Sequence, residues 1–370
     1  MGSGARPPIP TGPLMSESAG SVLGVGLLGA GPVTQAIHLP SLAGLTDTFR
    51  IASVMDVDMA LARSVAERAG ARATDSMDDL LADDSVDVVG ICSPHQFHAE
   101  QVIAACRAGK RAVMCEKPFA MTTAEAVAIA EVSAATEVPI VVGAMHRYDP
   151  GWLAAEENWG ALRDSAHWIR SSIVLPPNPR FEDFATEVLT RPPGRPVDYS
   201  DVDVRAGMVH GGVMGLAIHD LPLIRRFLPW PAEVEVLAAD INVPFGYLIV
   251  LRSGRLTIEL HAVMSENWSP NWLLEVIADD LALSVEFTPS YVQAGSAVAE
   301  LWSRGNTVQR FGPFGHNGYQ SEWLEVATVA QGQAPLVGTN DLIDDLTFAI
   351  DIADAAAKAL RHESALAVRA

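Results

Sequence analysis

The chain has 370 residues, more than one hydrophobic core usually supports, so its length predicts two domains. Hydrophobic residues make up 49% of it, and 45 acidic against 25 basic side chains give a formal net charge of −20. That charge disfavours nucleic acid and anionic membrane surfaces as partners, because both attract the opposite sign. The composition favours a globular protein with a small-molecule partner.

The first twenty residues are rich in Pro, Gly and Ser, which predicts a disordered tail over 1–20. Met15 lies inside this tail and is an alternative to Met1 as the start of the protein. The apolar stretch 22–33 resembles the core of a signal peptide, but one arginine precedes it and no small-residue cleavage site follows. We therefore expect no signal peptide. We also expect no membrane-spanning helix, because no apolar run in the sequence is long enough.

The three cysteines, Cys92, Cys106 and Cys115, are odd in number and lack the pairing typical of a metal site. Reduced thiols are therefore expected in preference to disulfides, which predicts a cytoplasmic protein.

Residues 21–146 alternate short apolar runs with alanine-rich stretches of helical spacing. Several of the runs are apolar on both faces, as in a parallel sheet that helices cover on both sides. This alternation predicts an α/β domain with a doubly wound parallel sheet, the Rossmann architecture. The expected strands are 22–28, 50–55, 86–91, 112–115 and 140–142, and the expected helices are 61–69, 99–108 and 124–135.

In residues 147–370 strand-like runs follow one another without the regular helical stretches between them. This pattern predicts a second, α+β domain with an open, mostly antiparallel sheet. The segment 176–198 contains PPNP and RPPGRP, which indicates a long loop or flap. The turn RSGR at 252–255 is expected to join two strands as a hairpin. The expected strands are 234–237, 247–251, 256–263, 272–277 and 281–287, followed by an amphipathic helix over 342–360.

The glycine-rich stretch VLGVGLLGAGPVT, residues 22–34, fits the dinucleotide-binding pattern G-x-G-x-x-G in two registers. The earlier register places its glycines in the apolar run and leaves no helix to follow. In the later register Gly29-Ala30-Gly31 forms the turn, and Pro32 takes the first helical position, where its missing N–H is no loss. Thr34 then replaces the third glycine. The later register therefore assigns phosphate binding to Gly29, Ala30, Gly31, Pro32 and Val33.

Asp56 ends the second expected strand, 22 residues after Thr34, where a carboxylate binds the hydroxyls of the adenosine ribose. A carboxylate there repels a 2′-phosphate, and Val57 and Asp58 offer no basic group for one. NAD is therefore the expected cofactor, and NADP is the less favoured one. The alternative is a glycine-rich turn that binds no nucleotide.

Glu116, Lys117 and Pro118 close an apolar strand at the carboxyl edge of the sheet, where ligands lie in such folds. A partly desolvated lysine at this edge can have a lowered pKa and exchange protons with a substrate hydroxyl. The alternative is a surface Lys–Glu pair at the end of a strand.

Four stretches together resemble the glucose–fructose oxidoreductase / inositol dehydrogenase / MocA family. They are GLLGAGPVTQAIHLPSL, SPHQFHAE followed by AGK, the tripeptide EKP, and GAMHRYDP at 143–150. Their order and spacing match over roughly the first 150 residues, and GGVMGLAIHDL at 211–221 extends the resemblance weakly over the rest.

The resemblance implies an NAD(P)-dependent dehydrogenase or reductase that acts on CH–OH groups of a sugar, cyclitol or sugar derivative. It also implies that residues 147–370 bind the substrate. The open sheet face of this part is expected to form a homodimer or homotetramer.

The resemblance further implies that Lys117 is the catalytic or proton-relay residue, with a cis bond to Pro118, and that His219 is an acid or base near the nicotinamide. The family has an aspartate four residues before this histidine on a helix, but this chain has Gly215. Asp220 points about 100° away on an ideal helix and is a poor replacement. Pro222 is expected to disturb the helix further. His219 as a merely packed histidine therefore stays an alternative.

The remaining expected contacts lie around the same edge. His95 and His98 are three residues apart near Cys92, but no carboxylate accompanies them, so no metal site is predicted. His38 and His98 match positions that the family commonly fills with histidine. The expected cofactor contacts after the fourth strand are Ser93, Pro94, His95 and His98, joined by Glu116 and Lys117, and the expected substrate contacts are Arg147, Tyr148 and His210.

Two functions follow from these expectations. The first is reversible hydride transfer between NAD and a secondary alcohol or ketone, with Lys117 relaying the hydroxyl proton. The second, motivated by Gly215, is a catalytically altered family member that binds dinucleotide or sugar as a sensor or regulatory protein.

Overall fold

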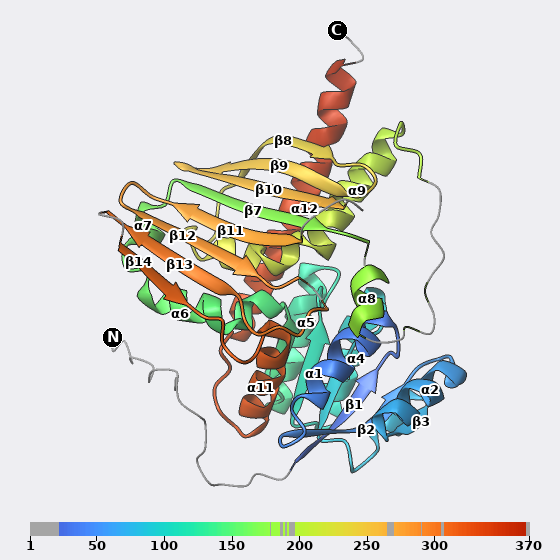
Figure 1. Cartoon of the computed structure of the whole chain (residues 1–370). Coiled ribbons are helices and arrows are strands. Elements are labelled where there is room, and N and C mark those ends of the chain that lie inside the picture. The colour runs from blue at the N-terminus through green and yellow to red at the C-terminus, as the bar shows by residue number, and fades with distance from the viewer. Residues whose placement is uncertain are drawn as a thin grey trace.

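The computed structural model describes residues 22–177, 179–185, 188, 191, 197–264, 270–289, 291–304 and 307–367. The predicted tail, with Met1 and Met15, lies outside the described residues, as do parts of the predicted loop 176–198. Two sheets form the framework, one of six strands and one of eight (Figure 1).

The first sheet has six parallel strands in the order β3-β2-β1-β4-β5-β6. This is the order of a doubly wound dinucleotide-binding sheet, so the predicted fold of the first region is confirmed. The strands are β1 (Leu23–Leu28), β2 (Phe49–Met55), β3 (Arg72–Thr74), β4 (Val88–Ile91), β5 (Ala112–Glu116) and β6 (Ile140–Gly143). The short strand β3 was not predicted.

Helical segments connect these strands. The first begins at Pro32, runs through a π-helical stretch η1 (Thr34–His38) and continues as α1 (Leu39–Ala43). The others are α2 (Met59–Ala69), α3 (Met77–Leu81), η2 (His95–Phe97), α4 (His98–Arg107) and α5 (Thr123–Thr136). The three predicted helices of this region are confirmed to within two residues at each end.

The second sheet has eight strands in the order β14-β13-β12-β11-β7-β10-β9-β8, and only the β7–β10 pairing among those described is parallel. The predicted, mostly antiparallel sheet is confirmed, including the hairpin at 252–255. The strands are β7 (Trp168–Leu175), β8 (Glu235–Ile241), β9 (Gly246–Ser253), β10 (Leu256–Met264), β11 (Asn271–Ile277), β12 (Leu281–Phe287), β13 (Val298–Ser303) and β14 (Thr307–Phe311). Strands β7, β13 and β14 were not predicted.

Helices of the second half cover one face of this sheet, as Figure 1 shows for α6, α9 and α12. The helical segments are η3 (Met145–Tyr148), α6 (Pro150–Asn158), α7 (Leu162–Ser165), α8 (Pro179–Ala185), α9 (Val202–Gly215), η4 (Ala217–His219), α10 (Leu221–Arg225), α11 (Gly318–Ala330) and α12 (Thr339–Ala367). The prediction of an irregular loop over 176–198 was wrong in part, because α8 lies within it. The predicted helix over 342–360 is confirmed as part of α12.

The two regions share a core. Trp323, Val326 and Val329 of α11 are buried with the side chains of the first sheet, although they follow the second sheet in sequence. The indole of Trp323 packs edge-on against Phe49 of β2, with ring centroids 5.6 Å apart. A domain boundary near residue 146 stays a proposal, and α11 belongs to the core of the first sheet whichever boundary is chosen.

Among the described residues, no helix combines the length and the apolar character that crossing a membrane requires.

Candidate functional site

The glycine turn lies between the ends of β1 and β4. Gly29 has φ +97, and a Cβ added there would lie 2.8 Å from the Cys92 carbonyl and the Ser93 amide nitrogen. Only glycine fits this backbone conformation and this close approach without strain. Gly31 differs, because a Cβ there would meet no described atom within 4 Å. The turn therefore packs on β4 at Gly29 and leaves open space in front of Gly31, where a pyrophosphate fits.

Thr34, which replaces the third glycine of the pattern, is fully buried and bonded to the turn. Its hydroxyl donates to the Gly29 carbonyl at 2.7 Å, and the Gln35 side chain donates to the Ala30 carbonyl at 2.8 Å. The helix begins at Pro32, so the amides of its first turn have no intrahelical acceptor and are available to an anion. This arrangement fits the phosphates of a dinucleotide and supports the later of the two registers.

Asp56 follows the end of β2 directly beside this turn. One carboxylate oxygen accepts from the Ala30 amide at 2.8 Å and the other from the Asp58 amide at 3.0 Å. The side chain is half-buried, so the carboxylate keeps an accessible edge for ribose hydroxyls.

The segment after β4 holds four further predicted cofactor contacts. Ser93 is half-buried and donates to Gln101 at 2.5 Å, and Pro94 and His95 are exposed. His98 is fully buried, and its two ring nitrogens lie 2.8 Å from the carbonyl oxygens of Pro118 and Ser93. His98 therefore joins the β4 turn to the β5 turn, whereas His95 stands at the surface with its ring centroid 5.4 Å from that of His98.

Lys117 follows β5 at the carboxyl edge of the sheet and is cis-bonded to Pro118. Its ammonium donates to the backbone carbonyl of Gly215 at 2.6 Å. Burial lowers the pKa of Lys117, and the negative charge of Glu116 offsets part of this effect. A lysine with a lowered pKa in this place can take up and release a proton near neutral pH more readily than a solvated one.

Glu116, the last residue of β5, lies in a buried cluster. It accepts from His38 at 3.0 Å and from the Lys117 amide at 3.2 Å. Burial raises the pKa of Glu116, but the hydrogen bond from His38 and the charge of Lys117 hold it below its usual value. Glu116 thus remains an anion beside Lys117.

Glu322 of α11 completes this cluster. It is fully buried, and neither carboxylate oxygen has a hydrogen-bond partner among the described residues. Burial raises the pKa of Glu322 well above its usual value, and the negative charge of Glu116 raises it further. Both effects favour the uncharged acid form of Glu322.

The ligand-type atoms of His38, Glu116 and Glu322 lie within 4.8 Å of one another, which is compatible with metal spacing. A metal-bound histidine donates its other ring N–H to an acceptor. Here the donor-only indole of Trp323 points at His38 Nδ1, 3.1 Å away, so Nε2 carries the hydrogen and donates it to Glu116. The cluster is therefore a hydrogen-bonded acid–imidazole group, and its geometry does not fit a cation.

The sequence predicted that Gly215 and His219 lie on one helix, but the structure places them in separate elements. Helix α9 ends at Gly215, and His219 ends the separate 3₁₀ turn η4. The expectation that a side chain at position 215 would lie beside His219 on one helix face was therefore wrong. Pro222 does not disturb a helix either, because it lies in the first turn of α10, where proline is tolerated.

His219 is buried, and its Nδ1 atom has no hydrogen-bond partner within the described ranges. Burial lowers the pKa of His219 well below its usual value, and the charges of Lys117 and His146 lower it further. The imidazole is therefore neutral at physiological pH and can accept a hydrogen bond from a hydroxyl group.

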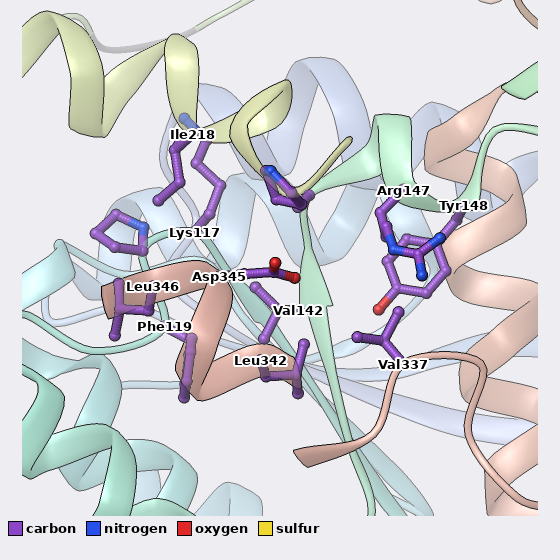
Figure 2. A pocket seen from close by; sticks show the side chains of 13 residues that line it. Lys117, Phe119, Val142, Arg147, Tyr148, Ile218, Val337, Leu342, Asp345 and Leu346 are labelled. Atoms are coloured by element: carbon purple, nitrogen blue, oxygen red, sulfur yellow. The ribbon is translucent and has the colours of Figure 1, made fainter. Parts of the chain in front are cut away.

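A small cavity adjoins Lys117, and Arg147 and Tyr148 line its other side (Figure 2). Its volume is about 30 Å³, which is well below the several hundred Å³ typical of ligand pockets. The Asp345 carboxylate lies between the two sides and receives a 2.5 Å hydrogen bond from Arg225. This cavity is too small to hold a sugar.

The structure brings two of the three predicted substrate residues near Lys117. Arg147 and Tyr148 are buried in η3 at the carboxyl end of β6, and Arg147 pairs with Glu156 at 3.4 Å. His210 lies elsewhere, on α9, with its half-buried ring 3.4 Å from Asp354 of α12. The described residues that line the cavity do not include His210, so its substrate role stays a prediction without geometric support.

A second buried network was missed by sequence reasoning. His146 Nδ1 lies 2.6 Å from one oxygen of Asp220, and the other oxygen accepts from Ser171 at 2.5 Å and from Trp272 at 2.8 Å. These residues come from η3, the η4–α10 junction, β7 and β11. His146 stands in GAMHRYDP and Asp220 follows His219 directly, but no sequence pattern links positions 74 residues apart.

Comparisons with known proteins agree with this geometry. A family model described as an oxidoreductase family with an NAD-binding Rossmann fold matches residues 23–144. Inositol 2-dehydrogenase 3 of Saccharopolyspora erythraea is 39% identical over 134 residues, or 36% of this chain and 39% of that protein. The chain thus spans about two fifths of the length of that relative. Inositol 2-dehydrogenase of Acidothermus cellulolyticus is 30% identical over 237 residues, which cover 61% of this chain and 68% of that protein.

Solved structures share the whole fold. UDP-N-acetylglucosamine 3-dehydrogenase GnnA from Acidithiobacillus ferrooxidans aligns with a TM-score of 0.69 at 20% identity and covers 92% of this chain and 99% of that one. The 3-ketoreductase KijD10 from Actinomadura kijaniata, in complex with NADP and TDP-benzene, aligns with a TM-score of 0.67 at 19% identity. That alignment covers 90% of this chain and 97% of KijD10. At these identities the likeness shows the fold.

Proposed function

The chain belongs to the glucose–fructose oxidoreductase / inositol dehydrogenase / MocA family, an NAD(P)-binding Rossmann oxidoreductase family, and from that premise we propose its reaction. The protein interconverts a secondary alcohol and a ketone on a sugar, cyclitol or sugar derivative. The observation that carries the proposal is the position of Lys117, whose half-buried ammonium lies at the carboxyl edge of the parallel sheet that also presents the glycine turn.

The chain's own residues have distinct roles in this reaction. The first-turn amides after Gly31 hold the pyrophosphate, and Asp56 holds the adenosine ribose. Lys117 takes the hydroxyl proton when the alcohol is oxidised and returns it when the ketone is reduced, while neutral His219 orients the substrate by accepting a hydrogen bond from a neighbouring hydroxyl. A bound nicotinamide supplies the acceptor or donor of the hydride. The ammonium that forms on Lys117 in a partly dry site stabilises a developing alkoxide better than water does.

The proposed cofactor is NAD. Asp56 places a carboxylate beside the turn, and it already accepts from the Ala30 amide, so its charge is fixed where a 2′-phosphate would lie. A phosphate there would meet like charge, and the following Val57 and Asp58 add no cation.

Replacing Lys117 with alanine tests the reaction. We expect turnover to fall by about 100-fold or more, the range of general acid–base contributions, with NAD affinity measured by calorimetry nearly unchanged. Lys358→Ala is the matched control, because this exposed lysine lies on α12. Unchanged turnover in Lys117→Ala with unchanged NAD binding would contradict the assigned role. If the unmodified protein bound dinucleotide but oxidised no polyol or sugar in a broad panel, the sensor alternative would be favoured.

We also propose that the open face of the eight-stranded sheet joins copies of the chain. This face exposes Leu248 of β9 and Trp302 of β13, with 44% and 43% of their surfaces accessible. Large exposed apolar side chains on a sheet face are typical of interaction surfaces. Trp302→Glu and Leu248→Glu should lower the mass measured by light scattering, whereas an unchanged mass in both variants would contradict this interface.

A further inference from the structure

A second cavity lies at the outer end of the eight-stranded sheet. Its volume is about 410 Å³, which is within the range typical of ligand pockets and far above that of the cavity beside Lys117. It is formed by α7 and the residue after it, by the segment that follows α10, and by the hairpin between β9 and β10. Figure 1 shows α7 at the end of this sheet that lies away from the six-stranded sheet. The two cavities have no described lining residue in common, so this one is separate from the proposed catalytic site.

One part of the lining is apolar and is held in place by packing. Phe227, Leu228 and Leu256 are buried side chains, and each of them lines the cavity. The ring of Phe227 packs against Trp159, with ring centroids 4.8 Å apart. Because buried side chains in a packed core keep their positions, this part of the lining is a preformed surface for the apolar part of a ligand.

A hydroxyl group adjoins this apolar surface. Ser253 ends β9 on the same face as the buried Leu251, and only 9% of its surface is exposed. Ser253 lines the cavity, and its hydroxyl forms no hydrogen bond with another described residue. Since polar groups in buried positions are normally hydrogen-bonded, this hydroxyl is available to a polar ligand atom.

Two guanidinium groups lie at the border of the cavity. Arg163 of α7 and Arg255 of the hairpin are exposed, and neither forms an ion pair with a described carboxylate. Arg255 donates instead to the backbone carbonyl of Asp164. Asp164 is the one acidic residue among the described lining residues, so two positive charges and one negative charge surround the cavity. In a chain with a net charge of −20, this local excess of positive charge favours an anionic ligand.

We propose that this cavity binds a small organic anion that carries a carboxylate or phosphate group on an apolar body. The guanidinium groups of Arg163 and Arg255 bind the anionic oxygens, because their planar N–H donors match carboxylate and phosphate. The Ser253 hydroxyl adds a further donor, and Phe227 and Leu228 contact the apolar body. The site does not depend on the proposed reaction, since it uses none of the residues assigned to that reaction.

Titration of the full chain with 4-fluorobenzoate, followed by fluorine NMR at low salt, tests the ligand class. This probe has an aromatic body and one carboxylate. We expect saturable binding with a Kd of about 1 mM or below. The uncharged 4-fluorobenzyl alcohol and inorganic phosphate, which lack the charge and the apolar body respectively, should bind at least about tenfold more weakly. Absence of saturable 4-fluorobenzoate binding, or equal affinity for the alcohol, would overturn the proposal.

Substitutions locate the bound probe. Arg163→Gln, Arg255→Gln and Ser253→Ala should each weaken 4-fluorobenzoate binding about threefold or more, whereas Asp164→Asn should strengthen it, because a like charge is removed. Arg252→Gln is the matched control and should change the Kd less than about twofold, because this exposed arginine of β9 does not line the cavity. Unchanged affinity in both Arg163→Gln and Asp164→Asn, or an equal loss in Arg252→Gln, would place the probe elsewhere and overturn the proposal. If Arg255→Gln did not fold, Arg163→Gln and Asp164→Asn would still decide.

Discussion

The side chain of Lys117 ends on the backbone carbonyl of Gly215, with 2.6 Å between Nζ and the oxygen. Gly215 is the last residue of α9, and the final carbonyls of a helix lack intrahelical partners and carry partial negative charge. A lysine ammonium is therefore stabilised there without a carboxylate. The position that looks like a lost acid in the sequence supplies a backbone acceptor in the structure.

Gly215→Asp should therefore change the pH dependence of alcohol oxidation. A Cβ at this position meets no described atom within 4 Å, so the side chain can be accommodated. Oxidation needs Lys117 as the free amine, so its rate should rise with pH through the lowered pKa of this group. A nearby carboxylate raises that pKa, so the rising limb of kcat against pH should move to higher pH. Gly215→Asn is the uncharged control, and equal limbs in the two variants would contradict the expectation.

Two glycines of the phosphate turn should respond in opposite ways to alanine. Gly31→Ala should fold normally, because its Cβ has open space, but should bind NAD at least about tenfold more weakly, because the methyl group occupies the phosphate position. Gly29→Ala should unfold at lower temperature, because its φ of +97 and the contact with Cys92 strain any side chain. Calorimetric NAD titration and thermal unfolding measure the two effects. Unchanged NAD affinity in a folded Gly31→Ala variant would argue against phosphate binding at this glycine turn.

Asp56→Ala should reduce the preference for NAD over NADP. Loss of the carboxylate removes the acceptor for the ribose hydroxyls and the repulsion of a 2′-phosphate, so the ratio of kcat/KM values should fall about tenfold or more. Asp58→Ala is a matched control, because Asp58 caps α2 by accepting from the Ala60 and Leu61 amides. This control should cost about 1 kcal/mol of stability and leave the cofactor ratio unchanged. Equal ratios in Asp56→Ala and the unmodified protein would remove the argument for NAD.

Glu322→Gln should stabilise the protein increasingly as the pH rises. Since folding raises the pKa of Glu322, the folded state holds a proton that the unfolded state releases above the ordinary carboxyl pKa of 4.5. The contribution of this group is thus most favourable below that pH and is lost towards the folded pKa, at up to about 1.4 kcal/mol per pH unit. Glutamine keeps the neutral shape without the titration. The urea midpoint of unfolding, measured from pH 4 to 8, tests this expectation, with the exposed Glu131→Gln as control. Curves of midpoint against pH that run parallel for Glu322→Gln and the unmodified protein would contradict it.

The glycine turn could be predicted because strand, turn, proline and helix are contiguous in sequence, and each has its own local signal. The same reasoning missed β7, where Ser171 is a polar residue in a buried strand position. Ser171 is tolerated in this buried position because its hydroxyl donates a hydrogen bond to Asp220, which lies 49 residues further along the chain. Local pattern cannot reveal a strand whose polar member is satisfied by a distant partner.

The site was predictable in its first half and less so in its second. Lys117 and Asp56 follow strands of a regular alternation, so their common edge could be inferred from order alone. Gly215 and His219 were read as one helix, but the chain changes from α9 to a 3₁₀ turn between them. Nothing in the spacing of GGVMGLAIHDL distinguishes a continuous helix from one that breaks at Leu216. His146, Asp220 and Glu322 gained their roles from contacts across the fold, which no periodicity encodes.

Trp323 of α11, already described as part of the first core, affects how the protein is made. Chains leave the ribosome amino end first, and their leading domains usually fold as they emerge. Here the nucleotide-binding sheet lacks a central side chain until residue 323 has been synthesised, since its indole packs on Phe49 and bonds to His38. We expect nascent chains that stop before α11 to expose this apolar gap and to recruit chaperones. The core of the six-stranded sheet can therefore be completed only late in synthesis, after α11 has been made.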